Sequence, residues 1–278
     1  MEENPAYTLR RYPCFNSLNE PLWPERWSFD ALNQRKAEIG SLKFTREYLC
    51  VPISTGTALF NPEFLNASKN KDDILRMGKK EGMKYYVGVD PAISTDGDYN
   101  VITVIEVDEN SNKRIVYIDR QKNVEFRENI EKVRLVGRIF SPEVVLFETN
   151  TFAKSFTQEL RNVSDLNVRD FNTTRKKKEE IILNLQMNFE NGKILMPYGD
   201  EASRTVTKML IEELSMFSIT EAGKFEGVGA HDDLVMSLAL ANSASSMMGE
   251  NFVLLDDMEI FDSPVQKQIN PGVMWLNF

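Results

Sequence analysis

The sequence predicts an α/β fold in which helices flank a mixed central sheet. Two observations point to this class. An apolar strand is followed by two further extended stretches that flank the polar turn Asp108–Asn112, which is typical of a hairpin. Beyond residue 124, helical and extended patterns alternate, as they do where helices connect parallel strands. Functional side chains in such sheets gather at the ends of strands.

Residues 1–82 differ in character from the rest of the chain, and we expect them to form a separate segment. Phe29–Leu49 has apolar residues at helical spacing on both sides of Gly40-Ser41, which predicts two short helices ending before Pro52. Several glycines and a proline interrupt the stretch from Val51 to Gly82, so we expect a linker with a short helix near Asp72–Met77.

Residues 83–249 carry the regular elements of the predicted sheet domain, and residues 250–278 form an acidic, then irregular tail. Strands are expected at Lys84–Asp90, Asn100–Val107, Lys113–Arg120, Glu143–Glu148, Asn167–Phe171 and Ile194–Met196, with a last hairpin of Met216–Ile219 and Lys224–Val228. Helices are expected at Val124–Phe140, Phe152–Val163, Lys176–Glu190, Glu201–Leu214 and His231–Ala244.

The net charge of −9 is not typical of a passive nucleic-acid binder, which needs a basic field. It is compatible with an enzyme that gathers carboxylates around metal ions and has a local basic patch. The two cysteines, Cys14 and Cys50, lack metal-ligand spacing and are expected to be reduced thiols, which favours the cytoplasm. No apolar run has the length of a membrane span and no signal peptide is evident, so no membrane partner is expected.

Two of the apolar strands end on a carboxylate, Asp90 in one and Glu148 in the other. If these strands are parallel neighbours, the two carboxylates lie side by side. Burying such charges is unfavourable unless something compensates them, and a metal ion is a common compensation. The alternative is that each residue only caps the turn after its strand.

Asp232 and Asp233 lie in the first turn of an apolar helix, where the helix dipole also favours negative charge for purely structural reasons. At about 100° per residue, Asp232 lies slightly nearer the apolar face. We therefore expect Asp232 to point towards the sheet as a metal ligand, with Asp233 nearer the rim as a second or outer ligand. Asp98 can approach the same site from the loop after the first strand, or it is an ordinary turn residue.

Three or four clustered carboxylates repel one another unless cations intervene. A site of oxygen ligands, in a chain with a single histidine (His231), suits Mg²⁺ or Mn²⁺ rather than zinc. Two such ions about 4 Å apart stabilise both the attacking water and the leaving oxygen of a phosphodiester. The sequence therefore predicts two Mg²⁺ or Mn²⁺ ions at the ends of the strands.

The chief basic run, Thr173–Lys178, stands at the start of a helix and is expected to grip phosphates; the alternative is a solvated helix start. The expected DNA-binding residues are Arg175, Lys176, Lys177, Lys178 and Lys154.

Three motifs together resemble the nuclease domain of the large terminase subunit of tailed bacteriophages. They are Val87-Gly-Val-Asp90-Pro-Ala, Leu146-Phe-Glu148-Thr-Asn and Gly229-Ala-His-Asp-Asp233-Leu-Val-Met-Ser-Leu-Ala. The stretch from Leu22 to Pro52 resembles the end of that family's ATPase region and its linker. The chain has no Gly-x-x-x-x-Gly-Lys-Ser/Thr loop, so no ATPase activity is expected from it alone.

This resemblance implies an RNase H-like fold and a two-metal endonuclease that cuts concatemeric double-stranded DNA at the start and end of packaging. Carried over by position, Asp90, Glu148 and Asp232 are the catalytic acids, and Asp233 and Asp98 are further metal ligands. The implied partners are DNA, the portal protein, the small terminase subunit and the ATPase domain of the same motor. The implied location is the host cytoplasm, at the prohead portal.

Two other functions stay open from the sequence. The first is a resolvase or transposase-like nuclease of the same fold, which would prefer branched DNA. The second is a non-catalytic docking module for a motor or portal partner, which would bind no divalent metal.

Overall fold

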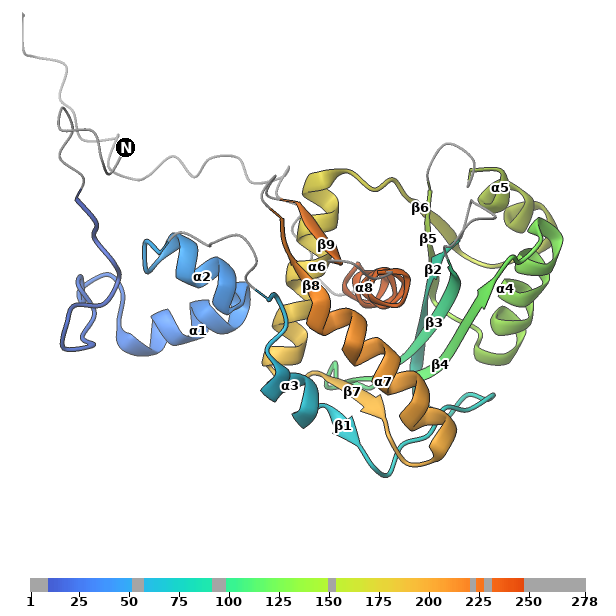
Figure 1. The fold of residues 1–278 in the computed structure, drawn as a ribbon, viewed down its shortest axis with the longest axis horizontal. Coiled ribbons are helices and arrows are strands. Elements are labelled where there is room, and N and C mark those ends of the chain that lie inside the picture. The colour runs from blue at the N-terminus through green and yellow to red at the C-terminus, as the bar shows by residue number, and fades with distance from the viewer. Residues whose placement is uncertain are drawn as a thin grey trace, which may run out of the picture. The chain divides into compact units, whose positions relative to one another are not determined.

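A seven-stranded mixed sheet organises the structure, a computed structural model that describes residues 10–51, 58–91, 99–149, 154–220, 224–227 and 232–247. The strand order is β1-β7-β4-β3-β2-β5-β6 (Figure 1). The strands are β1 (Lys69–Asn70), β2 (Lys84–Asp90), β3 (Tyr99–Val107), β4 (Lys113–Lys122), β5 (Val144–Glu148), β6 (Val168–Phe171) and β7 (Ile194–Pro197).

The predicted mixture of strand directions is confirmed. β2, β3 and β4 pair as an antiparallel meander, whereas β5 and β6 continue the sheet in parallel from β2. The carboxylate of Asp108 accepts hydrogen bonds from the backbone N–H groups of Asn110 and Asn112, which closes the turn between β3 and β4. This local side-chain bonding is the reason that the polar stretch ends one strand and starts the next.

Helices cover both faces of the sheet, and Figure 1 shows α4 and α5 on one face and α6, α7 and α8 on the other. Their bounds are α4 (Phe126–Phe140), α5 (Lys154–Val163), α6 (Arg175–Glu190), α7 (Glu201–Met216) and α8 (Asp233–Ser246). Between α4 and the sheet, side chains such as Val87, Val89 and Phe140 form an apolar core. Each such side chain contributes about 1.5–3 kcal/mol when fully buried.

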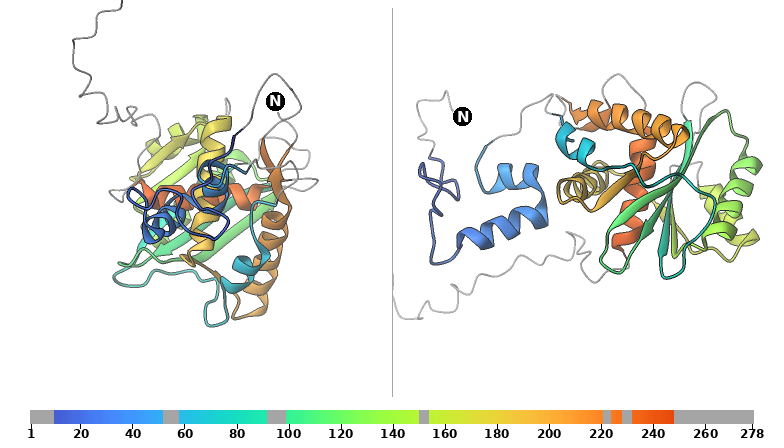
Figure 2. Two further views of the ribbon diagram at one scale, coloured as in Figure 1. Left: turned by 90° about the vertical axis from the view of Figure 1, so that its left-hand side faces the viewer. Right: turned by 90° about the horizontal axis from the view of Figure 1, so that it is seen from below.

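Helix α8 packs across the middle of the sheet, and every residue from Asp233 to Ala244 is buried. It approaches most closely at Gly88 in β2, where an added Cβ would lie 2.0 Å from the carbonyl oxygen of Ser237. The Ser237 hydroxyl also bonds to the carbonyl oxygen of Gly88, at 3.1 Å. Figures 1 and 2 both show α8 lying between the sheet and α6. The absence of a side chain at Gly88 therefore sets the position of α8.

The two short N-terminal helices expected around Gly40 are present as α1 (Phe29–Ile39) and α2 (Ser41–Glu47). They contact the C-terminal end of α6 through specific hydrogen bonds. The backbone N–H of Ser41 donates to Glu190 at 2.9 Å, and the Asn191 amide donates to the Ala37 carbonyl at 2.9 Å.

The expected short helix at Asp72–Met77 is wrong. Residues 72–77 contain no helix or strand. The regular elements of the expected linker are α3 (Pro62–Ala67) and strand β1, which pairs with β7. The side chain of Asn70 accepts a hydrogen bond from the Asp72 N–H and donates one to the Asp73 carboxylate. These bonds give the backbone a turn that competes with a helix.

The expected short hairpin before α8 is confirmed as β8 (Phe217–Ile219) paired with β9 (Phe225–Gly227). The predicted C-terminal tail, 250–278, lies outside the described residues. Among the helices that the structure describes, none combines the length and the apolar character that crossing a membrane requires.

Candidate active site

Strands β2 and β5 bring Asp90 and Glu148 together. The strands are parallel neighbours, with Val89 opposite Phe147 one residue before the two carboxylates. Val89 and Phe147 point into the core beneath α4. Because side chains alternate along a strand, Asp90 and Glu148 both project to the opposite face, where α8 lies. The condition under which the two carboxylates lie side by side, parallel and neighbouring strands, is therefore met.

Several acidic side chains lie near Asp90 and affect its pKa. Burial raises the pKa of Asp90 well above its ordinary value, and Glu148 raises it further by its charge and by a hydrogen bond between the two carboxyl groups. Smaller increases come from Asp233 and then Asp232.

The two aspartates at the start of α8 face different neighbours. Asp233 is buried, and its Oδ2 accepts a hydrogen bond from the backbone N–H of Tyr99 in β3, at 3.2 Å. Asp232 precedes the helix, and its Oδ2 lies 2.8 Å from the Nζ of Lys178 in α6. The expected orientation is therefore wrong, because Asp233 faces the sheet and Asp232 faces α6. Asp232 lies outside the regular helix, so the angular spacing of helical residues does not apply to it.

The four carboxylates share one region, but they have different partners. Asp90 is hydrogen-bonded to Glu148, Asp232 pairs with the Lys178 ammonium, and Asp233 accepts a hydrogen bond from a backbone N–H. Within the described ranges, no three histidine, cysteine or acidic side chains converge closely enough to hold a metal ion. The donor set consists of carboxylate oxygens, which fits Mg²⁺ or Mn²⁺. Burial and acidic neighbours raise the pKa of Asp90, and a divalent cation beside its carboxyl group would favour the ionised form.

The predicted basic residues lie at the start of α6, which is capped by Thr174 through a bond from the Lys177 N–H. Arg175, Lys176 and Lys177 are exposed, whereas Lys178 is partly buried against Asp232. Lys154 begins α5, but its side chain is outside the described residues, as are Asp98 and His231.

Glu213 in α7 and Arg120 in β4 form an ion pair next to the start of α8. The sequence did not predict this pair. Glu213 accepts a hydrogen bond from the Leu234 N–H at the start of α8 (2.9 Å) and pairs with Arg120 at 3.1 Å. Burial raises the pKa of Glu213 to about 7, against the lowering influence of Arg120. The pair anchors the beginning of α8. No local pattern distinguishes Glu213 from other helical glutamates, so only the tertiary packing identifies it.

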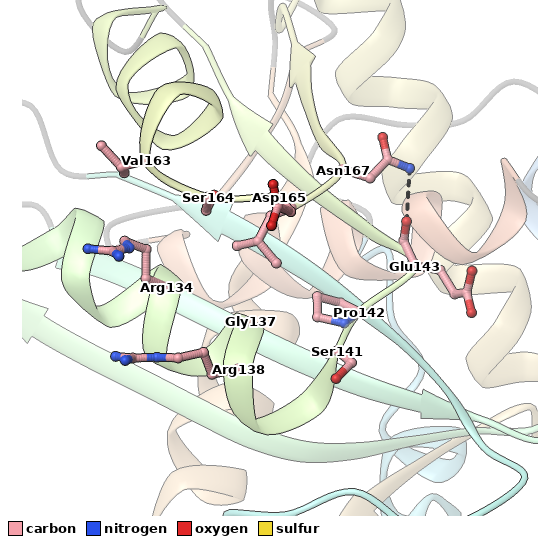
Figure 3. Close-up of a pocket in the computed structure, with 11 residues that line it drawn as sticks. Arg134, Gly137, Arg138, Ser141, Pro142, Glu143, Val163, Ser164, Asp165 and Asn167 are labelled. Carbon is pink, nitrogen blue, oxygen red and sulfur yellow. Dashed lines mark hydrogen bonds between the residues drawn. The ribbon is translucent and has the colours of Figure 1, made fainter.

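A hollow of about 520 Å³ lies at the opposite end of β5 from Glu148 (Figure 3). Arg134 and Arg138 project from α4 on one side of it, and the Asn167 amide donates to the Glu143 carbonyl on the other. Glu143 immediately precedes β5, whereas Glu148 ends it. The hollow is therefore separate from the carboxylate region.

The fold is shared with several phage proteins of known structure. The large terminase nuclease from the thermophilic phage G20c is 21% identical, with a TM-score of 0.51 over 67% of this chain and 97% of that one. A second structure of that nuclease, with bound magnesium, gives a TM-score of 0.51 over 69% of this chain and 98% of that one. The HK97 bacteriophage large terminase is 11% identical and gives a TM-score of 0.52 over 77% and 49%. These similarities show that the chain shares the fold of large terminase nuclease structures.

The sequence comparison identifies the family. The terminase RNaseH-like domain model matches residues 87–244, more than half of the chain, so the chain belongs to that family. The large terminase subunit of Thermus virus P23-45 is 24% identical over 246 residues, which is 84% of this chain and 47% of that protein. The chain thus spans about half the length of the curated relatives that it matches.

Proposed function

We propose that this chain is a metal-dependent endonuclease that hydrolyses phosphodiester bonds of double-stranded DNA during phage DNA packaging. The observation that carries the proposal is the position of Asp90 and Glu148 on adjacent parallel strands, beside the two aspartates at the start of α8. Membership of the terminase RNaseH-like family supports it, as do solved relatives described as nucleases with bound magnesium and cobalt.

The chain's own residues supply the ligands and their support. Asp90 and Glu148, with Asp232, Asp233 or both, would hold two Mg²⁺ or Mn²⁺ ions, with Asp98 as a further candidate from its loop. When bound, such ions activate water and stabilise the leaving oxygen of a phosphodiester. Asp90 is influenced by Glu148, Asp233 and Asp232, so it would be the ligand shared most closely with the other carboxylates. Glu213 and Arg120 fix the helix start that carries Asp232 and Asp233.

The start of α6 is suited to hold the DNA backbone. Arg175, Lys176 and Lys177 are exposed at the helix N-terminus, where the helix dipole favours a negatively charged phosphate. Lys178 is closer to the carboxylates, because its ammonium lies on Asp232. Lys154 is a further candidate. With a net charge of −9, the isolated chain should bind DNA weakly and with strong salt dependence.

In the virus-infected cell, we propose that the domain cuts concatemeric DNA at the start and end of packaging, in the host cytoplasm at the prohead portal. Its proposed partners are the portal protein, the small terminase subunit and the ATPase domain of the motor. Support comes from the curated relatives, which are large terminase subunits about twice as long. Residues 1–82 would then be the end of the ATPase region and its linker.

Plasmid cleavage in Mg²⁺ or Mn²⁺ tests the proposal. The wild-type chain should nick and linearise the plasmid, and Asp90→Asn should abolish this. Asp165→Asn is a matched control, because it removes one exposed carboxylate beside the hollow at the far end of β5. Equal cleavage by wild type and Asp90→Asn would contradict the assigned site. A strong preference for branched DNA would favour a resolvase, and absence of divalent-metal binding would favour a docking module.

A further inference from the structure

A basic and aromatic group of side chains lies on the same face of the sheet as Asp90. Asp90 is directly opposite Val101 in β3, which is directly opposite Arg120 in β4. Residues that are directly opposite in a sheet point to the same face. Two residues further along, Tyr99 is opposite Lys122, so this pair also projects to the face of Asp90.

The ring of Tyr99 contacts both Arg120 and Lys122. The guanidinium carbon of Arg120 lies 3.4 Å from the centroid of the Tyr99 ring, and the Nζ of Lys122 lies 4.5 Å from it. The Tyr99 backbone is also fixed, because its N–H donates to Asp233. The ring therefore holds both cations on the face of the sheet to which Asp90 projects, through cation–π attraction.

The two cations have different roles in this arrangement. Arg120 is largely buried and pairs with Glu213, so its charge is used within the protein. Lys122 is exposed, and in the described part of the chain no carboxylate pairs with it. An ammonium that is held in place but lacks an anionic partner is suited to bind an anion from solution.

We propose that Lys122, held on Tyr99, binds a backbone phosphate of the DNA substrate on the β4 side of the carboxylates. This inference rests on the proposed nuclease function, and it adds a contact from β4 to those proposed at the start of α6. The DNA backbone would thus be held by two separate elements beside the carboxylates.

The spacing agrees with a phosphate a few nucleotides from the cleaved bond. β2 and β4 are two strand spacings apart, about 10 Å, and Lys122 lies two residues beyond the level of Asp90, about 7 Å along the strand. Each nucleotide of one strand advances about 3.4 Å along the duplex axis. The two offsets combine to about 12 Å, so with the duplex axis along this direction Lys122 reaches a phosphate about three to four nucleotides away. The contact reads the backbone rather than the base sequence.

The test measures binding of the intact chain to a linear DNA duplex at several salt concentrations. Ca²⁺ replaces Mg²⁺, and a gel confirms that the duplex stays intact. Lys122→Ala should weaken binding and make the slope of log K against log salt shallower by about 0.9, the value for one phosphate contact. Lys122→Arg should restore most of the affinity. Lys84→Ala is the matched control, since Lys84 is an exposed lysine at the other end of β2 and its removal changes the net charge equally.

The outcomes separate this inference from the proposed function. If wild type binds and cleaves DNA, and Lys122→Ala has the same affinity and slope as Lys84→Ala, the Lys122 contact is wrong while the nuclease stands. If Lys122→Ala loses affinity and Lys84→Ala does not, the contact is supported. If wild type neither binds nor cleaves DNA, the proposed function and this inference both fail. Tyr99→Leu should reproduce the loss, whereas Tyr99→Phe, which retains the ring, should not.

Discussion

Lys178 and Asp232 form an ion pair in which Nζ lies 2.8 Å from Oδ2, at the meeting point of α6 and the start of α8. Their side chains are only 22% and 30% exposed. The ammonium therefore occupies a position beside a carboxylate that we propose as a metal ligand. A lysine in this place competes with a divalent cation for the same oxygen.

Removal of this competition should strengthen metal binding. We expect Lys178→Met to lower the Kd for Mn²⁺ by up to about fivefold, since a partly exposed ion pair contributes up to about 1 kcal/mol. Calorimetric titration with Mn²⁺ measures the change. Lys177→Met is the control, because Lys177 is exposed and should leave the Kd unchanged. Weaker Mn²⁺ binding by Lys178→Met would show that the ammonium supports the ligands instead of competing.

The packing of α8 on β2 should be intolerant of even one methyl group at Gly88. An alanine Cβ would lie 2.0 Å from the Ser237 oxygen and 2.4 Å from the Ala241 nitrogen, both of which are backbone atoms. Overpacking of this kind costs roughly 1–3 kcal/mol or more. We expect Gly88→Ala to lower the free energy of unfolding in urea by about 3 kcal/mol. Gly78→Ala, where nothing lies within 4 Å, should change it little, and equal stability of the two variants would refute the packing argument.

Lys113 should make stability depend on pH above neutrality. Its buried Nζ bonds to Asn242 at 2.6 Å and to Asn188 at 3.1 Å. Burial lowers the pKa of Lys113 from 10.5 to about 8, and the charge of Lys193 adds to this. Between these two values the unfolded chain binds a proton that the folded chain has lost. The free energy of unfolding should therefore rise with pH, by about 1.4 kcal/mol per unit from this group.

Comparison of the wild type with Lys113→Met isolates the contribution of Lys113 to the pH dependence of the free energy of unfolding. Other lysines and tyrosines titrate in the same range, but they are common to both proteins. Urea unfolding at about pH 8 and about pH 9.5 should show the wild type gaining stability relative to the variant. A difference between the two proteins that does not change with pH would mean that Lys113 is charged with an ordinary pKa in the folded state.

The main sheet was predictable because its strands carry strong local patterns. The run that ends at Asp90 and the run that ends at Glu148 are apolar and short, and the Asp108–Asn112 turn is defined by its own side chains. Strand β1 was not predictable, because its two residues acquire their pairing only from β7, far along the chain. Short strands of this kind depend on tertiary contacts rather than on local pattern.

The carboxylates of the site could be found from sequence for the same reason, since strand ends are visible in the hydrophobic pattern. The orientation of Asp232 and Asp233 could not be predicted from the sequence. Whether Asp232 or Asp233 faces the sheet depends on the residue at which α8 begins, and helix boundaries are poorly defined by sequence. Glu213 and Lys122 owe their positions to helix packing and to strand register, which no local motif records.

The central claim is that Asp90, Glu148 and the aspartates at the start of α8 hold divalent metal ions together. Crystals grown with Mn²⁺ and measured for its anomalous scattering test this directly. We expect two anomalous peaks among these carboxylates, with Lys178 displaced from Asp232, and loss of the peaks in Asp90→Asn. Mn²⁺ density only elsewhere on the protein, with the Lys178–Asp232 pair intact, would contradict the account.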